Sequence, residues 1–323
     1  MRPRRYLITG GAGFIGSNFI RHLLNVEPHA RVTNLDLLTY AGVRATVEEL
    51  DSSPSHHFLH GDIRDAELVE HAVEGQDVIV HFAAESHVDR SIAAAGDFLT
   101  TNVIGTSILL DAARRSGVRR FLHVSTDEVY GSIPIGRAAE DAPLSPSSPY
   151  SASKAGADLL VLSYVTTYDF EAIVTRCTNN YGPYQHPEKL IPRFVTNAIR
   201  GLPMPLYADG RNERDWLHVQ DHVNALHLLL SEGEVGEVYN IGADAQQSNI
   251  DVTHMVLNHF GLDESWIEWT PDRPGHDLRY AVDSSKLRSL GWAPEHSFEE
   301  GLPSTIAWYE EHEAWWRPLV EGA

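Results

Sequence analysis

The feature that most constrains this chain is a glycine-rich turn near its N-terminus. The apolar run Tyr6–Thr9 leads into Gly10-Gly-Ala-Gly-Phe-Ile-Gly16, and the stretch Phe14–Asn25 then follows a helical period. Glycines in a strand-to-helix turn let backbone N–H groups approach a pyrophosphate, which then lies at the positive end of the helix dipole. The turn therefore predicts the first strand–helix unit of a dinucleotide-binding sheet.

An acidic residue lies where such a sheet needs one. Asp36 follows Gly16 by about twenty residues and ends the second apolar run, the position at which a carboxylate binds the adenosine ribose hydroxyls. Its charge would repel a 2′-phosphate, and the next residue is Leu37 rather than an arginine. We therefore expect the cofactor to be NAD and not NADP.

Apolar runs alternate with helical stretches through roughly the first half of the chain. The runs predicted as buried parallel strands are Tyr6–Thr9, Val32–Asp36, His57–His60, Val78–Phe82, Phe121–Ser125 and Ala172–Arg176. The helices predicted between them are Phe14–Asn25, Glu67–Val73, Phe98–Ser116 and Tyr150–Thr167. This alternation predicts an α/β fold built on a doubly wound parallel (Rossmann) sheet.

The pattern changes after Gly182, where prolines and turns become frequent. Later helices are predicted at Val219–Leu230, Val252–Phe260 and Phe298–His312. We expect a dinucleotide-binding domain over residues 1–182, with return segments from about 215–242, and a smaller mixed α/β substrate domain over 183–323. The loop Ser132–Ser148 is rich in Pro, Ser and acidic residues, and its length is typical of a lid.

Tyr150 and Lys154 form a Y-x-x-x-K pair at the start of a predicted helix. Residues four apart share a helix face, so both side chains can point at one ligand. A nearby ammonium favours the phenolate, and we expect it to lower the pKa of Tyr150. The pair would then act as a base toward a sugar hydroxyl while hydride leaves for NAD.

Thr126-Asp127-Glu128 follows the predicted strand Phe121–Ser125. Carboxyl ends of strands in such sheets face the ligand crevice, so two adjacent carboxyls there indicate acid–base chemistry. Mutual repulsion and burial would raise one pKa and leave one carboxyl neutral. Adjacent residues on a straight strand point apart, so both can serve only if the backbone turns here. A solvated acidic turn or a helix N-cap is the alternative interpretation.

Composition narrows the remaining possibilities. The formal net charge of −20 disfavours nucleic acid and anionic membranes as partners, although locally converging Arg and Lys can still bind a small anion. No apolar run is long enough to span a bilayer, and Cys177 is the only cysteine. We therefore expect a cytoplasmic protein. The eighteen histidines include His56-His57 and His218…His222 but no metal-site motif, so we expect no metal.

At this point the sequence resembles the extended short-chain dehydrogenase/reductase family and, more closely, the dTDP-glucose 4,6-dehydratases. The resemblance covers nearly the whole chain. It includes Gly10–Gly16, Leu35-Asp36…Thr39-Tyr-Ala-Gly42, Ala83–Ser91, Ser125–Gly131, Tyr150…Lys154, Asn179–Tyr184, Pro187–Pro192, Arg214-Asp-Trp216 and Asp272–Asp277. The Thr-Asp-Glu triplet is the most specific of these motifs, because related epimerases and decarboxylases lack the Asp-Glu pair.

The resemblance implies roles for the catalytic candidates. Tyr150, with Lys154 and Thr126, would oxidise carbon 4 of the sugar. Glu128 would then remove the proton at carbon 5, and Asp127 would protonate the departing carbon-6 hydroxyl. The stored hydride would return to carbon 6, so that NAD is regenerated in each turnover.

The resemblance also implies binding positions. Those expected around NAD, including the strand ends Asp62-Ile63 and Ala83-Ala84 that could equally be plain strand-end residues, are Gly10, Gly13, Phe14, Ile15, Gly16, Asp36, Leu37, Thr39, Asp62, Ile63, Ala83, Ala84, Ser86, Thr101, Tyr150, Lys154 and Asn180. Those expected around a nucleotide-sugar such as dTDP-glucose are His87, Thr126, Asn179, Lys189, Leu190, Pro205, Tyr207, Arg214, Asn249, Asp272, Arg273 and His276. Leu37 departs from the family, where many relatives carry a basic residue.

Two alternative functions share most of these residues. A nucleotide-sugar 4-epimerase or decarboxylase would use Tyr150, Lys154 and NAD without the Asp127-Glu128 pair. An inactive NAD-binding module would need none of the chemistry, yet every residue that the chemistry requires is present. The motifs leave the nucleobase and the pathway of the product open.

We also expect a homodimer, because the helices Phe98–Ser116 and Tyr150–Thr167 resemble those that form a four-helix bundle in the family and are apolar on more than one face.

Overall fold

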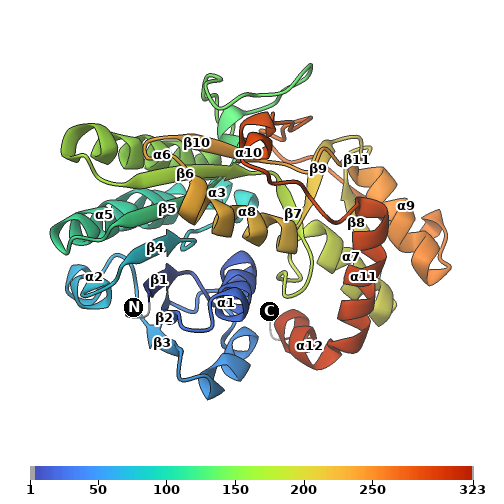
Figure 1. Ribbon diagram of the computed structural model, residues 1–323. Helices are drawn as coiled ribbons and strands as arrows, with labels where there is room; N and C mark the ends of the chain where they lie inside the picture. The colour runs from blue at the N-terminus through green and yellow to red at the C-terminus, as the bar shows by residue number, and fades with distance from the viewer. Residues whose placement is uncertain (1–3, 322–323) are drawn as a thin grey trace.

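A seven-stranded, fully parallel sheet forms the centre of the molecule in the computed structural model, which describes residues 4–321 (Figure 1). The strand order is β10-β6-β5-β4-β1-β2-β3. The strands are β1 (Arg5–Thr9), β2 (Arg31–Asp36), β3 (His56–His60), β4 (Val78–His81), β5 (Arg120–Thr126), β6 (Ala172–Cys177) and β10 (Val238–Ile241). Each of the six predicted strands is present within two residues of its expected ends, and the predicted doubly wound Rossmann sheet is confirmed.

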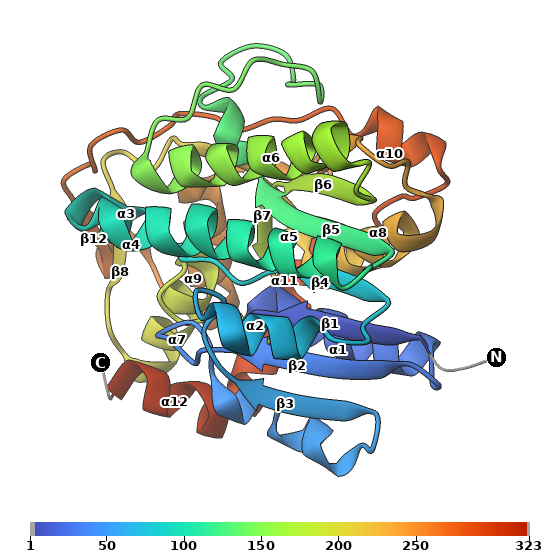
Figure 2. The ribbon, with the colours of Figure 1, turned by 90° about the vertical axis from the view of Figure 1, so that its left-hand side faces the viewer.

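Helices cover both faces of this sheet. On one face, α1 (Phe14–Val26) packs beside α8 (Val219–Glu232) over a core that contains Phe19, Leu23 and Leu226. On the other face, α2 (Ala66–Val73), α5 (Thr106–Arg115) and α6 (Pro149–Tyr168) lie side by side, as Figure 2 shows. Strands buried on both faces are typical of parallel sheets, which explains their nearly continuous apolar sequences.

The C-terminal half builds a second, smaller group of mixed elements with its own core. A three-stranded sheet has the order β11-β9-β7, and a parallel pair joins β12 to β8. The elements are β7 (Asn179–Tyr181), α7 (Leu190–Arg200), β8 (Met204–Tyr207), β9 (Glu213–His218), β11 (Gln246–Ser248), α9 (Asn249–Phe260), β12 (Ile267–Thr270), α11 (Phe298–Glu311) and α12 (Glu313–Glu321). Helix α10 (Ser285–Ser289) instead packs against β10 of the main sheet. This agrees with the predicted mixed α/β character of this part.

The helix expected over Phe98–Ser116 is present, but its first part is π-helical and not α-helical. A short α4 (Ala95–Phe98) runs into a π-helical segment, η3 (Leu99–Gly105), before α5 begins at Thr106. Within the π-helical segment, Asn102 exchanges hydrogen bonds with the backbone of Glu85 and also donates to Ser153. Such π-helical segments occur frequently at functional sites, and here the side chain ties the helix to the loop after β4.

The start of α6 shows why the catalytic helix begins where it does. Ser148 is the N-cap, its hydroxyl accepts a hydrogen bond from the Ser151 backbone N–H, and the Ser151 hydroxyl reaches back to the Ser148 N–H. Pro149 occupies the first helical position, where its missing N–H costs nothing. This capping box places Tyr150 and Lys154 in the first turns of the helix.

The loop 132–148 is fastened to the chain around residues 279–283 and does not line the main cavity described below. The N–H groups of Ile133 and Ala138 donate to the carbonyls of Arg279 and Ala281. Near its end, Ser147 hydrogen bonds to Asp277. The loop in which a lid was expected is thus tied to residues 277–281 by backbone and side-chain hydrogen bonds.

Short helices complete the chain: α3 (Val88–Ala93), η1 (Arg44–Thr46), η2 (Glu48–Ser52), η4 (Asp127–Tyr130) and η5 (Glu264–Trp266). Among the described helices, none combines the length and apolar character needed to cross a membrane.

Candidate active site

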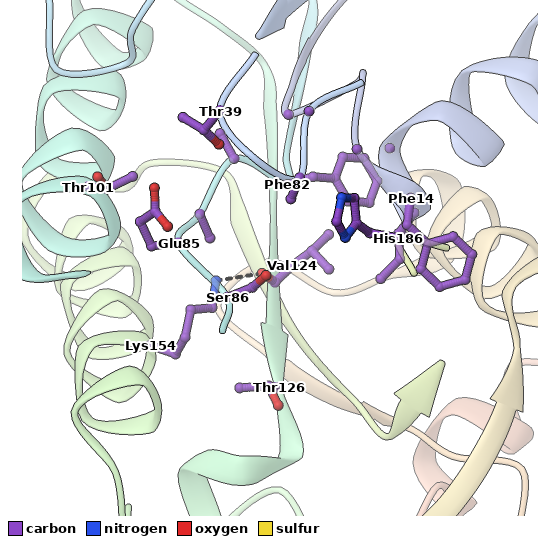
Figure 3. Close-up of a pocket in the computed structure, with 18 of the residues that line it drawn as sticks. Phe14, Thr39, Phe82, Glu85, Ser86, Thr101, Val124, Thr126, Lys154 and His186 are labelled. Carbon is purple, nitrogen blue, oxygen red and sulfur yellow. Dashed lines mark hydrogen bonds between the residues drawn. The ribbon is translucent and has the colours of Figure 1, made fainter. Parts of the chain in front are cut away.

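A cavity of about 330 Å³ opens at the carboxyl ends of β1, β2, β4 and β5 (Figure 3). It is the crevice at which open parallel sheets bind their ligands. Its lining includes all seventeen residues expected around NAD and all five catalytic candidates, Thr126, Asp127, Glu128, Tyr150 and Lys154. Helices α6 and η3, the turn after β1 and the segment 177–189 supply the other walls.

The glycine-rich turn is too tight for side chains. Gly10 has φ +73, and a Cβ on it would lie 2.6 Å from the backbone N of Ala83. A Cβ on Gly16 would lie 2.4 Å from the carbonyl oxygen of Gly10. The turn thus presents bare backbone to the cavity at the N-terminus of α1, which is the cradle that a pyrophosphate requires.

Asp36 is held at the end of β2 by two backbone donors. Its Oδ2 accepts from the Ala12 N–H at 2.9 Å, and its Oδ1 accepts from the Leu38 N–H at 2.8 Å. Burial raises the pKa of this carboxyl, and the two hydrogen bonds oppose that shift. The fixed carboxylate borders the cavity beside Leu37, whose side chain is partly exposed. This geometry fits a partner for ribose hydroxyls.

Tyr150 and Lys154 are both buried on the cavity side of α6. The Lys154 Nζ donates to the Val124 carbonyl oxygen at 2.8 Å, the contact drawn in Figure 3. Burial and the nearby Glu128 carboxylate raise the pKa of Tyr150, and a hydrogen bond with Thr126 opposes them. Lys154 is not among the groups that shift it, so the predicted lowering of the Tyr150 pKa was wrong for the protein alone. Burial lowers the pKa of Lys154 to about 8.

The backbone does turn where the two carboxyls require it. Strand β5 ends at Thr126 and the 3₁₀ turn η4 begins at Asp127. The Thr126 hydroxyl caps this turn by accepting from the Glu128 N–H at 3.2 Å, and it donates to Asp127 Oδ1 at 3.4 Å. Because of the turn, Asp127 and Glu128 both line the same cavity instead of pointing to opposite faces of a strand.

The two carboxyls have different surroundings. Burial raises the pKa of Asp127 well above its ordinary value, and the neighbouring Glu128 and Asp215 carboxylates add to the shift. Burial also raises the pKa of Glu128, but Arg273, Arg214 and Lys189 counteract it. Both pKa values are raised, but that of Asp127 has no comparable set of cations to oppose it, and carboxyls whose surroundings differ in this way can divide the roles of general acid and general base.

Charged side chains gather where α3 meets the segment before α7. Lys189 Nζ donates to the Ser86 carbonyl at 3.2 Å and lies 3.8 Å from Glu188. The Glu188 carboxylate also lies 3.6 Å from His87 Nε2. Burial, reinforced by Lys189, lowers the pKa of His87 to about 4, so its imidazole is neutral. Of this group, Ser86, Glu188 and Lys189 line the cavity itself.

The other residues expected around a nucleotide-sugar divide into two groups. Thr126, Asn179 and Lys189 line the cavity. Outside its lining are His87, Leu190, Pro205, Tyr207, Arg214, Asn249, Asp272, Arg273 and His276. Several of these contact one another, since Tyr207 donates to Asp89, Arg273 lies 3.7 Å from the same carboxylate, and His276 pairs with Asp272 at 2.6 Å.

Arg214 is a buried cation beside the carboxyl pair. It donates to the backbone carbonyls of Asp277 and Leu278, and its guanidinium stacks 4.4 Å from the centre of the Tyr280 ring. Burial lowers its pKa, and the Glu128 and Asp127 charges oppose that shift. Its contacts leave it bound to neutral acceptors, so its charge remains available to an anionic ligand.

Sequence reasoning missed several lining residues. Glu85 and Glu188 lie inside motifs already singled out, Ala83–Ser91 and Pro187–Pro192, but were assigned no role. His186 borders the cavity near Phe14, as Figure 3 shows, and burial lowers its pKa to about 4. Nothing in the local sequence distinguishes His186 from the other histidines; its place depends on how the segment after β7 folds back toward α1.

Comparison with known proteins identifies the family. The model of the GDP-mannose 4,6 dehydratase family matches residues 7–305. The chain belongs to this family.

Relatives within and near the family agree with the resemblance seen in the motifs. A dTDP-glucose 4,6-dehydratase of Streptomyces antibioticus is 52% identical, covering 97% of this chain and 94% of the relative. The low-salt glycan biosynthesis protein Agl12 of Haloferax volcanii is 54% identical, covering 94% of this chain and 97% of the relative. The crystal structure of DesIV, a dTDP-glucose 4,6-dehydratase from Streptomyces venezuelae with NAD and TYD bound, superimposes with a TM-score of 0.95 at 53% identity, covering 98% of this chain and 99% of DesIV. The predicted resemblance is confirmed.

Proposed function

We propose that this chain is a dTDP-glucose 4,6-dehydratase, which converts dTDP-glucose to dTDP-4-keto-6-deoxyglucose and water by internal hydride transfer through bound NAD. One observation carries the proposal: Asp127 and Glu128 line the same cavity as Tyr150 and Lys154. An epimerase needs the second pair and has no use for the first. The relatives named dTDP-glucose 4,6-dehydratase, which span nearly the full chain, support this choice of substrate.

The cavity fits NAD at one end. The backbone of Gly10, Gly13 and Gly16 would hold the pyrophosphate, and Asp36 would hold the adenosine ribose. Asp62, Ile63, Ala83 and the other predicted positions would border the remainder. When bound, NAD supplies a reversible acceptor for one hydride. The DesIV structure, which contains NAD, supports this cofactor.

Tyr150 would act as the base for oxidation once NAD is bound, because the positive charge of the nicotinamide ring would favour the phenolate against the burial that raises the Tyr150 pKa in the protein alone. It takes the proton of the carbon-4 hydroxyl, while Thr126 orients that hydroxyl and the phenol. The Lys154 Nζ lies 2.8 Å from the Val124 carbonyl oxygen and places a positive charge in the part of the lining that contains Thr126 and Tyr150. General acid–base groups of this kind typically contribute about 10²–10⁴-fold to the rate.

Elimination falls to the carboxyl pair. The ketone acidifies the hydrogen on carbon 5, and Glu128, the carboxyl with compensating cations around it, removes that proton. Asp127, whose pKa is raised well above its ordinary value, is the neutral acid that protonates the carbon-6 hydroxyl as it leaves.

The nucleotide end of the substrate would lie toward the C-terminal elements. Lys189 and Arg214 are the cations suited to a diphosphate in so acidic a protein. The sugar and the nucleoside would be surrounded by His87, Asn179, Leu190, Pro205, Tyr207, Asn249, Asp272, Arg273 and His276. We propose accordingly that residues 1–182, with return segments from about 215–242, bind the cofactor, and that 183–323 bind the substrate.

Assembly and location are part of the same proposal. Exposed apolar side chains on α3, η3 and α6, namely Ile92, Leu99, Ile104 and Leu159, lie on adjacent helices and support a homodimer. The lone cysteine, Cys177, is buried and unpaired, which supports a reducing, cytoplasmic location.

The test is direct. Purified protein is mixed with dTDP-glucose, and the product is examined for a keto sugar, after alkali treatment and by mass for the loss of one water. A panel of glucose nucleotides carrying other bases measures the selectivity for thymine. Formation of dTDP-galactose without loss of water would overturn the dehydratase assignment in favour of an epimerase.

A further inference from the structure

Three separate segments of the chain line the cavity and are also joined to one another. They are the loop after β2, the loop between β4 and α3, and the segment before α7, which Figure 3 marks with Thr39, Ser86 and His186. Two further residues of these segments, Tyr40 and Arg90, lie outside the lining. The contacts that these two side chains make hold the three segments together.

The Tyr40 ring lies at the centre of these contacts. The guanidinium carbon of Arg90 lies 3.7 Å from the centre of the ring, and the His186 ring meets it edge-on with 6.3 Å between the ring centres. The Tyr40 hydroxyl accepts a hydrogen bond from the Ser86 N–H at 3.4 Å. A cation over an aromatic face and an edge-to-face pair of rings are both favourable arrangements. One side chain of the first segment therefore contacts both of the others.

Charged contacts join the second and third segments. Arg90 lies 3.4 Å from Glu188 Oε2, so its guanidinium has an aromatic ring on one side and a carboxylate on another. Arg90 is 51% exposed and Glu188 is 13% exposed, so the arginine lies on the solvent side of this ion pair. The Lys189 Nζ also donates to the Ser86 carbonyl at 3.2 Å. The loop after β2 and the segment before α7 cannot separate without losing the contacts of Arg90.

The first and third segments are also fixed to the glycine-rich turn and its helix. The Val43 N–H donates to the Ala12 carbonyl at 3.1 Å. Asn18, in α1, donates its side-chain N–H to the Pro183 carbonyl at 3.0 Å. The two segments are thus joined on one side through the turn that fits a pyrophosphate, and on the other through Tyr40, so the contacts form a closed ring.

We propose that Tyr40 and Arg90 form a clasp that retains NAD during turnover and opens when the cofactor leaves. The role rests on the proposed function, in which the hydride leaves the sugar and returns to it on the same bound cofactor. Escape of NADH between the two transfers would release an unreduced keto sugar, and the enzyme could then restart only with NAD from solution. Arg90 is a positioning residue in this proposal, because it acts on the cofactor through the segments that it joins.

Release of NAD tests the clasp without any sugar. Each protein is loaded with radiolabelled NAD, chased with an excess of unlabelled NAD and filtered at intervals. Arg90→Met and Tyr40→Leu should release the label about tenfold faster than native protein, because each removes the cation–ring contact. Tyr40→Phe keeps the ring and should release the label at the native rate. Arg114→Met is the matched control, since Arg114 lies 4.5 Å from the centre of the Tyr168 ring and neither residue lines the cavity.

Turnover supplies a second measurement. With dTDP-glucose and no added NAD, native protein should form product at a constant rate. Arg90→Met should slow progressively as NADH escapes, should release unreduced keto sugar, and should recover when NAD is added. Loss of a purely structural contact would lower the rate from the start and would not be reversed by NAD.

The outcomes separate the clasp from the proposed function. Equal release of NAD from native protein and Arg90→Met overturns the clasp. Faster release from Tyr40→Phe overturns it as well, since the hydrogen bond to Ser86 would then be the cause, and so does equally fast release from Arg114→Met. If Arg90→Met lacks the native urea transition, Tyr40→Leu decides the question. Native protein that forms no keto sugar overturns the proposed function, whereas release of the label still decides the clasp.

Discussion

At the scale of single residues, the carboxyl pair shows how neighbours in sequence acquire different chemistry. Asp127 is the more deeply buried of the two, and two other carboxylates raise its pKa further. Three cations oppose the rise in the pKa of Glu128 that burial causes. Sequence alone predicted two carboxyls with split pKa values. The family resemblance assigned the acid role to Asp127. The physical difference between the two carboxyls comes from Asp215, Arg214 and Arg273, which lie far away in sequence and are brought together only by the fold.

Oxidation and elimination should therefore fail independently. Tyr150→Phe removes the group that takes the carbon-4 proton, so no NADH absorbance should appear on adding dTDP-glucose. Glu128→Gln and Asp127→Asn leave oxidation possible and block the loss of water, so both should accumulate enzyme-bound NADH and a 4-keto sugar. Turnover should fall by about 10²–10⁴-fold in each. Stopped-flow absorbance in the near ultraviolet separates the two phenotypes.

Isotope exchange sharpens this prediction. Incorporation of solvent deuterium at carbon 5 should be lost in Glu128→Gln and retained in Asp127→Asn. If both carboxyl variants dehydrate at the native rate, the pair is only a solvated turn. If neither variant reduces NAD, the carboxyls position the substrate and take no part in elimination.

Lys154 should make stability depend on pH in the alkaline range. Burial lowers its pKa from 10.5 to about 8 in the folded protein, so between these values the unfolded chain binds more protons than the native one. Stability contributed at this position should thus rise as pH increases from about 8 to 10, by on the order of 3 kcal/mol. Urea unfolding at both pH values measures it. Lys154→Met removes the ammonium, and an equal rise in that variant would show that other groups are responsible.

At the scale of elements, the glycine turn, the strands of the main sheet and the start of α6 follow from local sequence. The π-helical segment η3 does not, because its cause is the hydrogen bonding of Asn102 to Glu85 and Ser153, which are distant in sequence. Helix α7 was also missed. Pro192 belongs to the proline-rich stretch after Gly182, yet it lies in the first turn of that helix, where proline is tolerated.

The glycine turn offers a matched pair of substitutions. A Cβ on Gly16 would lie 2.4 Å from the Gly10 carbonyl, so Gly16→Ala must push the turn apart and should weaken NAD binding at least about tenfold. Gly96, in α4, has nothing within 4 Å of an added Cβ, and Gly96→Ala should leave NAD binding unchanged and raise stability by about 0.5–1 kcal/mol. Calorimetric titration with NAD and urea unfolding measure both effects. Equal NAD affinity in native protein and Gly16→Ala would place the pyrophosphate elsewhere.

At the scale of the whole molecule, the sequence predicted the Rossmann sheet, the mixed C-terminal part and most of the cavity lining. It could not predict how the C-terminal elements meet that cavity. Lys189 lines the cavity, whereas Arg214, His276 and Tyr207 lie outside its lining. Their positions depend on long-range pairings such as β12 with β8 and β11 with β9, which no local pattern specifies.

The exposed face of the helical layer leads to a prediction about assembly. Leu99 is 51% exposed, Ile104 53% and Leu159 59%, on helices η3 and α6, which pack side by side in Figure 2. Burying these side chains against a second copy would remove apolar surface from water at roughly 25 cal/mol per Å². Native protein should therefore be a dimer by light scattering at micromolar concentration. Leu159→Glu should shift it toward monomer, because two-fold symmetry would bring the new charges together, whereas the same change at Ile135, which is exposed on the loop 132–148 and lies on neither helix, should leave the mass unchanged. A native monomer, or a Leu159→Glu protein that stays dimeric, would contradict pairing through this face.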